Sequence, residues 1–297
     1  MTHDPRPFGR LLTAMVTPFA PDGSLDVEGA AKLATHLVDE QRNDALVVSG
    51  TTGESPTTTD AEKETLLRAV VEAVGDRARV VAGVGTNNTA HTVELAHAAE
   101  KAGAHGLLVV TPYYNKPPQA GVAKHFRTVA DAVGLPIIVY DIPHRAGTAI
   151  ATDTMCRLAE HERIVAVKDA KGDFTASSWV LSRTDLAYYS GDDVATLPLL
   201  SVGGVGLVGT STHFTGPIAK DLILAYERGD VATAVALHRK ALPLFTGIFR
   251  SPGTMLVKAG LHARGLPAGP VRAPLVDASD EELNQLRKDA AEAGIVL

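Results

Sequence analysis

Cysteine is almost absent from this sequence: only Cys156 occurs among its 297 residues. A single cysteine excludes an intrachain disulfide and any metal site that is built from several cysteines. Proteins that do without disulfides are typical of reducing compartments, so we expect a cytoplasmic location.

Blocks of basic residues and long apolar runs are also missing. The chain has 28 Lys and Arg against 34 Asp and Glu, which gives a net charge of −6. Nucleic acids and anionic membranes require clustered Lys and Arg, so we expect neither as a partner. No segment approaches the roughly 18 uncharged apolar residues of a membrane span, and the N-terminal MTHDPRPFGR lacks the apolar core of a secretory signal. These absences fit an ordinary soluble globular protein.

Eight short apolar runs recur along the chain, with amphipathic segments between them. The runs lie at 11–19, 45–50, 79–85, 106–112, 137–143, 164–170, 186–192 and 206–212. Such nearly continuous apolar runs are typical of strands that are buried on both faces of a parallel sheet. Their spacing of roughly 20 to 35 residues is the length of a βα unit. Because no G-x-G-x-x-G follows the first run, an open dinucleotide-binding sheet is disfavoured. The sequence predicts an α/β fold, a (β/α)8 TIM barrel.

Helix-start signals support this alternation. Thr59 with Glu62, and Ser279 with Glu282, have the spacing of a capping box. We also expect Thr152 to cap the helix that follows it.

The C-terminal part has a different organisation. After about residue 228 the apolar strand-like runs stop, and three helical segments follow. We therefore expect a catalytic barrel over residues 1–228 and a small C-terminal helical domain over residues 229–297 that packs against it.

Polar or glycine-rich groups follow several of the predicted strands. In a TIM barrel, the catalytic groups lie at the C-terminal ends of the strands and in the loops after them. Five strands run into such groups, in GTTGES, TPYYNKPP, DIPHRAG, VKDAKGD and SGDD. The candidate residues are Thr51, Thr52, Tyr114, Tyr140, Arg145, Lys168 and Gly191. Their convergence on one rim predicts an active site.

Lys168 ends the apolar run IVAVKDA and has two interpretations. It could reach solvent or pair with Asp169. Alternatively, an apolar pocket lowers the pKa of its ammonium, and the neutral amine attacks a carbonyl to form a Schiff base. We expect Lys171, three residues later, to be the solvated lysine.

The other candidates also have a structural and a chemical interpretation. Tyr140 and Tyr114 could be packing aromatics, or their hydroxyls could carry protons for Schiff-base chemistry. Thr51 and Thr52 could cap a helix, or they could bind a small carboxylate with their hydroxyls and neighbouring N–H groups. Arg145 could be a surface charge or a bidentate carboxylate clamp.

Histidine does not point to a metal site. The chain has 11 histidines, but none forms an H-x-H at a strand end or an H-E-x-x-H motif. We expect no metal and no organic cofactor.

Taken in order, the motifs GTTGES, VTPYYNKP, YDIPHRAG, VKDAKGD and YSGDD resemble those of the pyruvate-dependent class I aldolase and lyase family. The similarity runs from about Gly9 to the end of the barrel and, more loosely, through the helical tail. It implies that Lys168 forms an imine with pyruvate. Arg145 favours the branch that condenses pyruvate with L-aspartate 4-semialdehyde to 4-hydroxy-tetrahydrodipicolinate, on the route to diaminopimelate and lysine. The alternative is a paralogous aldolase that acts on a 2-keto-3-deoxy sugar acid or on N-acetylneuraminate.

The resemblance also implies roles for the hydroxyl-bearing candidates. Thr51 and Thr52 would hold the carboxylate of pyruvate, and Tyr140 would assist proton transfer at the imine. Thr51, Tyr114 and Tyr140 would form a proton relay, with Tyr114 supplied by a neighbouring subunit. The family is typically homotetrameric, a dimer of dimers.

The resemblance places further groups around these. Arg145 would bind the carboxylate of the semialdehyde, and Gly191 and Val208 would line the pocket with backbone carbonyls. Two positions depart from the family pattern: Asp141 stands where asparagine is common, and Gly209 where a serine is common. We expect Asp141 to have little effect on the mechanism, whereas Gly209 could alter the edge of the pocket.

A regulatory pocket for lysine in feedback-sensitive members would correspond here to Asp60, Lys63 and His91. A cationic Lys63 would repel the ammonium group of a bound lysine. The resemblance therefore implies weak or absent inhibition by lysine.

Overall fold

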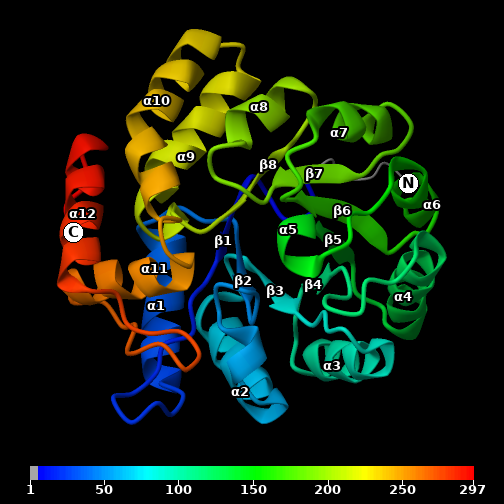
Figure 1. Ribbon diagram of the computed structural model, residues 1–297, viewed down its shortest axis with the longest axis horizontal. Coiled ribbons are helices and arrows are strands. Elements are labelled where there is room, and N and C mark those ends of the chain that lie inside the picture. The colour runs from blue at the N-terminus through cyan, green and yellow to red at the C-terminus, as the bar shows by residue number, and fades with distance from the viewer. Residues whose placement is uncertain (1–5) are drawn as a thin grey trace.

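Eight parallel strands close into a barrel (Figure 1) in the computed structural model, which describes residues 6–297. The strands are β1 (Leu11–Ala14), β2 (Ala45–Val48), β3 (Arg79–Gly83), β4 (Gly106–Val110), β5 (Ile137–Asp141), β6 (Ile164–Asp169), β7 (Ala187–Ser190) and β8 (Gly206–Gly209). Each strand pairs with the next, and β8 pairs with β1. The predicted TIM barrel is confirmed. Each strand is shorter than its apolar run, because the last residues of the run turn out of the sheet into the loops above it.

Helices surround the barrel in alternation with the strands. They are α1 (Val27–Asp39), the 3-10 helix η1 (Ser55–Thr57), α2 (Asp60–Val74), α3 (Thr89–Lys101), α4 (Gln119–Ala132), α5 (Pro143–Ala146), α6 (Thr152–Leu158), α7 (Phe174–Leu181), α8 (Thr196–Ser201), α9 (Thr212–Glu227), α10 (Val231–Gly247), α11 (Gly253–Ala263) and α12 (Asp280–Glu292). Within residues 6–297, no helix is both long and apolar enough to cross a membrane.

The alternation of side chains along each strand divides the core into two regions. In β6, Ala166 belongs to the cluster that fills the barrel interior, whereas Val167 packs in the layer between strands and helices. Lys168 therefore faces inward like Ala166, at the C-terminal end of the strand. The β5–β6 register pairs Tyr140 with Lys168, which sets the two inward side chains at one level.

The helix-start predictions are confirmed at two of three places. The capping boxes of Thr59 with Glu62 and of Ser279 with Glu282 are both formed. The prediction for Thr152 is wrong, since Thr152 is the first helical residue of α6 and the cap position before it is Ala151. A tertiary contact lies at this start: the Ala151 N–H donates to Gln119 Oε1 of α4 at 2.9 Å.

The three C-terminal helices form a layer on one side of the barrel. Helix α10 packs on α9, and α12 packs on both α10 and α11; in Figure 1 this layer lies beside α1 and α9. The expected boundary at 228/229 falls between α9 and α10. The division into a barrel domain and a helical domain stays a prediction.

Candidate active site

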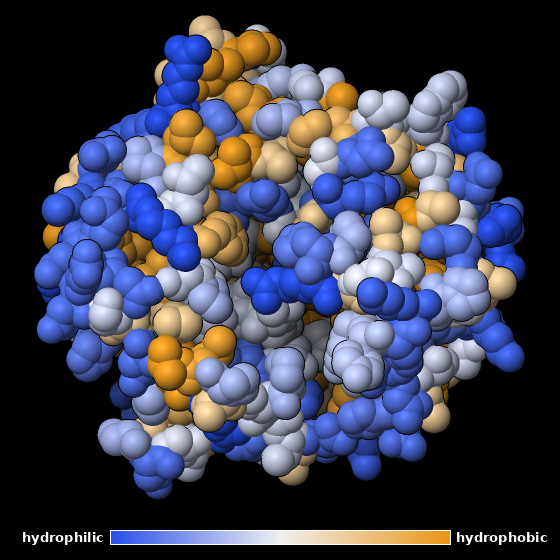
Figure 2. Space-filling model, viewed as in Figure 1, coloured by the Kyte–Doolittle hydropathy of each residue, from blue (hydrophilic) through white to orange (hydrophobic). Residues whose placement is uncertain are grey.

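A cavity of about 860 Å³ opens at the C-terminal end of the barrel, between the strand ends and the C-terminal helices. Figure 2 shows the hollow near the centre of this face. Six of the predicted site residues line it: Thr51, Thr52, Tyr140, Arg145, Lys168 and Gly191. Residues that are up to 140 positions apart in the chain thus meet in one place.

Lys168 is buried at the floor of this cavity, with a relative exposure of 5%. Its Nζ lies 4.3 Å from the centroid of the Tyr140 ring. Burial lowers the pKa of the Lys168 ammonium from 10.5 to about 8; the negative charge of Asp193 opposes this shift, and the positive charge of Arg145 adds to it. These surroundings favour the interpretation of Lys168 as a neutral amine over that of a lysine in solvent.

The neighbours of Lys168 in the motif VKDAKGD are engaged elsewhere. Asp169 faces the outer layer, where it accepts hydrogen bonds from Ser177 Oγ at 2.5 Å and from the Lys171 N–H at 2.8 Å. The expectation of a solvated Lys171 is wrong: its side chain is only 19% exposed, and its Nζ lies 3.7 Å from Asp141 Oδ2. Burial raises the pKa of Asp141 to about 6, and the Lys171 ammonium partly offsets this shift. Lys171 thus compensates a buried carboxylate.

Tyr140 and Thr51 meet at the edge of the cavity, whereas Tyr114 lies outside it. Burial raises the pKa of Tyr140 to about 12, and the nearby Arg145 and a hydrogen bond with the Thr51 side chain oppose the rise. Tyr114 follows β4 in the left-handed region, with φ of 72°, and is 90% exposed. The chain therefore brings together two members of the expected relay.

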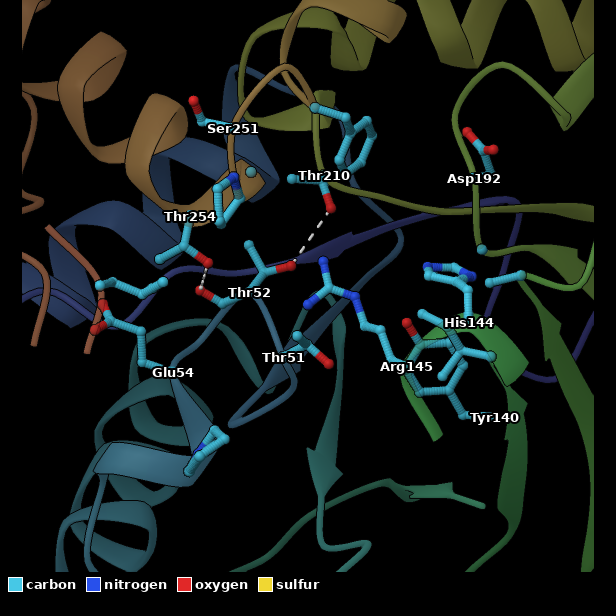
Figure 3. Close-up of a pocket in the computed structure, with 18 of the residues that line it drawn as sticks. Thr51, Thr52, Glu54, Tyr140, His144, Arg145, Asp192, Thr210, Ser251 and Thr254 are labelled. Carbon is cyan, nitrogen blue, oxygen red and sulfur yellow. Dashed lines mark hydrogen bonds between the residues drawn. The ribbon is translucent and has the colours of Figure 1, made fainter. Parts of the chain in front are cut away.

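Thr52 connects two neighbouring elements. Its Oγ1 lies 3.4 Å from Thr210 Oγ1, and its carbonyl accepts a hydrogen bond from Thr254 Oγ1 at 3.1 Å (Figure 3). Helix α2 is capped by Thr59 and the 3-10 helix η1 begins after Glu54, so neither Thr51 nor Thr52 is a helix cap. The two threonines are left to face the cavity.

Arg145 extends from the short helix α5 into the cavity. Figure 3 shows its guanidinium directed toward Thr51 and Thr52. Its charge contributes to the lowered pKa of Lys168. This placement favours a ligand-binding role over that of a surface charge.

The two residues expected to supply backbone carbonyls differ in position. Gly191 lines the cavity, and a Cβ on it would lie 3.0 Å from Lys168 Cγ, so the absence of a side chain lets this loop approach the lysine closely. Val208 is 1% exposed and belongs to the interior cluster of the barrel. It is not among the residues that line the cavity. Its role stays a prediction.

Gly209 makes room for a buried carboxylate. A Cβ at this position would lie 2.9 Å from Asp193 Oδ1. Asp193 accepts hydrogen bonds from the Thr210 N–H and from the N–H and Oγ of Ser211. Glycine at position 209, in place of the serine common in the family, therefore leaves space for the buried Asp193 carboxylate, whose hydrogen bonds connect the loop after β7 to the residues that follow β8.

Sequence reasoning missed several residues of the cavity. Glu54 and Thr210 line it; Glu54 follows the second predicted run and Thr210 lies near the end of the eighth, so their position at strand ends was a usable signal. Thr254 and Arg272 also line it, but they come from the C-terminal region, where no motif marked them. Among residues 6–297, no group of three or more His, Cys, Asp or Glu side chains is arranged to hold a metal ion.

The three residues assigned to a lysine pocket do lie together, away from the cavity. His91 Nε2 is 2.8 Å from Asp60 Oδ2. Lys63 Nζ donates to the Thr58 carbonyl at 2.6 Å and lies 3.8 Å from Asp60 Oδ1. The lysine response itself stays a prediction.

Comparison with known proteins supports the motif resemblance. The model of the dihydrodipicolinate synthetase family matches residues 7–293. A 4-hydroxy-tetrahydrodipicolinate synthase of Acidothermus cellulolyticus is 70% identical over 98% of this chain and 94% of the relative. A second, of Streptomyces coelicolor, is 60% identical over 98% of this chain and 97% of the relative.

Solved structures agree with these relatives. The dihydrodipicolinate synthase of Cyanidioschyzon merolae with lysine bound superposes with a TM-score of 0.95 at 42% identity, covering 97% of this chain and 99% of that one. The chloride-inhibited enzyme of Acinetobacter baumannii, complexed with pyruvate, gives 0.93 at 33% identity, covering 97% of this chain and all of that one (100%). The chain therefore belongs to the dihydrodipicolinate synthetase family.

Proposed function

We propose a residue-level mechanism for this chain, which is an enzyme with 4-hydroxy-tetrahydrodipicolinate synthase activity in lysine biosynthesis. The substrates of the proposal are pyruvate and L-aspartate 4-semialdehyde. The observation that carries it is the buried amine of Lys168 at the cavity floor, beside Tyr140.

The first step is imine formation. The neutral Lys168 amine attacks C2 of pyruvate, and the resulting carbinolamine loses water. At pH 8 a lysine with its ordinary pKa of 10.5 is only about 0.3% neutral, whereas the pKa of about 8 in this site makes it about half neutral. Burial thus raises the concentration of the attacking form by more than a hundredfold.

Proton transfers during this step pass through Tyr140 and Thr51. The pKa of Tyr140 is raised to about 12, so its phenol stays protonated and can donate to the departing hydroxyl. Its hydrogen bond with Thr51 provides the next member of the relay. The hydroxyls and N–H groups around Thr51 and Thr52 hold the pyruvate carboxylate.

The carbon–carbon bond forms in the second half of the reaction. Loss of a methyl proton converts the imine to an enamine, whose carbon attacks the aldehyde carbon of the semialdehyde. Arg145 clamps the carboxylate of that second substrate. The amino group of the semialdehyde then attacks C2, and Lys168 leaves as the free amine. The lysine itself supplies the electron sink, so no metal or organic cofactor takes part.

Tyr114 completes the relay from a neighbouring subunit of a homotetramer. Its 90% exposure and left-handed backbone at the tip of the β4 loop support this assignment, because a large aromatic side chain held out from the surface is suited to insertion into a second copy. A single chain would then have an incomplete relay.

Reductive trapping tests the proposal. The enzyme is incubated with pyruvate and borohydride, digested, and analysed by mass spectrometry, with Lys168→Met treated in parallel. We expect a pyruvate adduct on the peptide that contains Lys168 and none in the variant. A coupled assay should show turnover with pyruvate and the semialdehyde and no cleavage of keto-deoxy sugar acids or N-acetylneuraminate. An adduct on another side chain would refute the mechanism.

A further inference from the structure

A buried ion pair joins the C-terminal helices to the loop that carries Thr51 and Thr52. Lys258 of α11 places its Nζ 2.6 Å from Oε1 of Glu54, and the two side chains are only 3% and 1% exposed. Glu54 lies two residues after Thr52, at the end of the GTTGE turn. Apart from Lys258, Glu54 Oε1 has no hydrogen-bond partner. Removing Lys258 alone would therefore leave a buried carboxylate oxygen without compensation.

The same carboxylate and ammonium are held from further sides. Glu54 Oε2 accepts a hydrogen bond from the Arg272 N–H at 2.8 Å. Lys258 Nζ donates to the Pro270 carbonyl at 2.8 Å and lies 4.1 Å from the centroid of the Phe19 ring. Glu54 itself adopts φ of 57°, a left-handed conformation that is uncommon for residues other than glycine and persists when the surroundings determine it. The contacts thus hold the loop in a backbone shape that it would not favour alone.

A second link from α11 reaches the turn directly. Thr254 Oγ1 donates to the Thr52 carbonyl at 3.1 Å (Figure 3). Because this carbonyl is fixed toward α11, the peptide plane that follows Thr52 cannot rotate freely. Thr254 precedes Lys258 by one helical turn, so both links come from one face of the same helix.

Stability alone does not account for such a pair. Replacing a buried ion pair by apolar residues of similar volume is often neutral or stabilising, because the desolvation of both charges offsets their attraction. A directional contact at the edge of an active site instead selects one loop conformation.

We propose that Glu54, Lys258 and Thr254 form a brace from α11 that positions the Thr51–Thr52 turn to receive the carboxylate of the keto acid. They are positioning residues, since they act through the turn. The inference rests on the proposed role of Thr51 and Thr52. It gives the C-terminal helices a part in binding of the first substrate.

The main test is the double variant Glu54→Gln/Lys258→Met, which removes the pair and leaves no unpaired buried charge. We expect its melting temperature to stay close to that of the wild type, while KM for pyruvate rises about tenfold, because a small misplacement of a binding group is costly. KM for the semialdehyde should change less than twofold. A KM for pyruvate within twofold of the wild type in this variant would overturn the brace.

A milder pair of variants covers the case in which the double variant does not fold. Thr254→Val removes the hydroxyl but keeps the shape of the side chain, and it should raise KM for pyruvate about threefold. Thr254→Ser keeps the hydroxyl and should remain within twofold of the wild type. Equal KM values for these two variants would also overturn the proposal.

Lys220→Met is the matched control. Lys220 forms a partly buried ion pair with Asp44, outside the cavity, so the same substitution should lower stability and leave both KM values unchanged. Borohydride trapping of pyruvate on the wild type separates the two hypotheses. If the wild type traps pyruvate on Lys168 but KM does not respond to the brace variants, only the brace fails; if trapping fails, the proposed function fails.

Discussion

The burial of Lys168 should make the enzyme less stable than a variant without this amine. This loss of stability should be largest below pH 8 and should disappear above pH 10.5. The pKa of Lys168 falls from 10.5 in the unfolded chain to about 8 in the folded protein. At 1.36 kcal/mol per pKa unit, this shift corresponds to about 3 kcal/mol of lost folding stability when the lysine is charged in both states. The amine that catalysis requires therefore carries a stability cost.

The sign of the pH dependence follows from the proton count. Between pH 8 and 10.5 the unfolded chain holds the proton and the folded protein has released it, so the free energy of unfolding rises with pH through this window. Below pH 8 the full cost is present, and above 10.5 it disappears. Lys168→Met has no such proton, so its advantage over the wild type should be largest near pH 7.

Denaturant unfolding of the wild type and of Lys168→Met at a series of pH values from 6 to 10.5 measures this difference. We expect the variant to gain about 3 kcal/mol relative to the wild type at pH 7, compared with the difference at pH 10.5, and to form no imine. Any pH-independent packing change from methionine cancels in this comparison. A stability difference that stays constant across the window would refute the reasoning that burial depresses the pKa of Lys168.

Three further predictions concern neighbouring residues. Asp141→Asn should stabilise the enzyme by about 3 kcal/mol at pH 8 and much less at pH 4, because the raised pKa of about 6 costs stability only as pH rises above 3.8. Denaturant unfolding at both pH values checks this, with kcat as a control, and an equal gain in stability at the two pH values would contradict it. Arg145→Ala should raise KM for aspartate semialdehyde more than tenfold and leave pyruvate trapping intact, and a change mainly in KM for pyruvate would contradict its role as the clamp of the second carboxylate. L-Lysine should inhibit weakly or not at all in the steady-state assay, because the Lys63 ammonium, 3.8 Å from Asp60 in the corresponding pocket, would repel the ammonium group of a bound lysine. A sub-millimolar inhibition constant would refute this prediction.

Several elements of this protein could be predicted from local sequence. The eight apolar runs predicted the barrel strands because burial on both faces of a parallel sheet requires continuous apolar sequence. The capping boxes at Thr59 and Ser279 are formed by hydrogen bonds that span three residues, so they depend little on the rest of the fold. The strand-end rule placed six candidate residues at the cavity.

Other features depend on residues that only the folded chain brings together. Lys171 was expected in solvent, but it lies beside the buried Asp141 of another strand. Helix α6 begins at Thr152, and the residue before it, Ala151, is hydrogen-bonded to α4.

The type and order of the elements, and the presence of an amine that can react with a keto acid, follow from local sequence, because strand burial, helix caps and motif residues are encoded within short stretches. The desolvation of that amine and the conformation of the loop that carries Thr51 and Thr52 depend on tertiary packing. Glu54 and Lys258 are separated by some 200 positions, and nothing in either segment specifies the other. Their pairing results from the packing of α11 against the barrel, and packing depends on the whole chain.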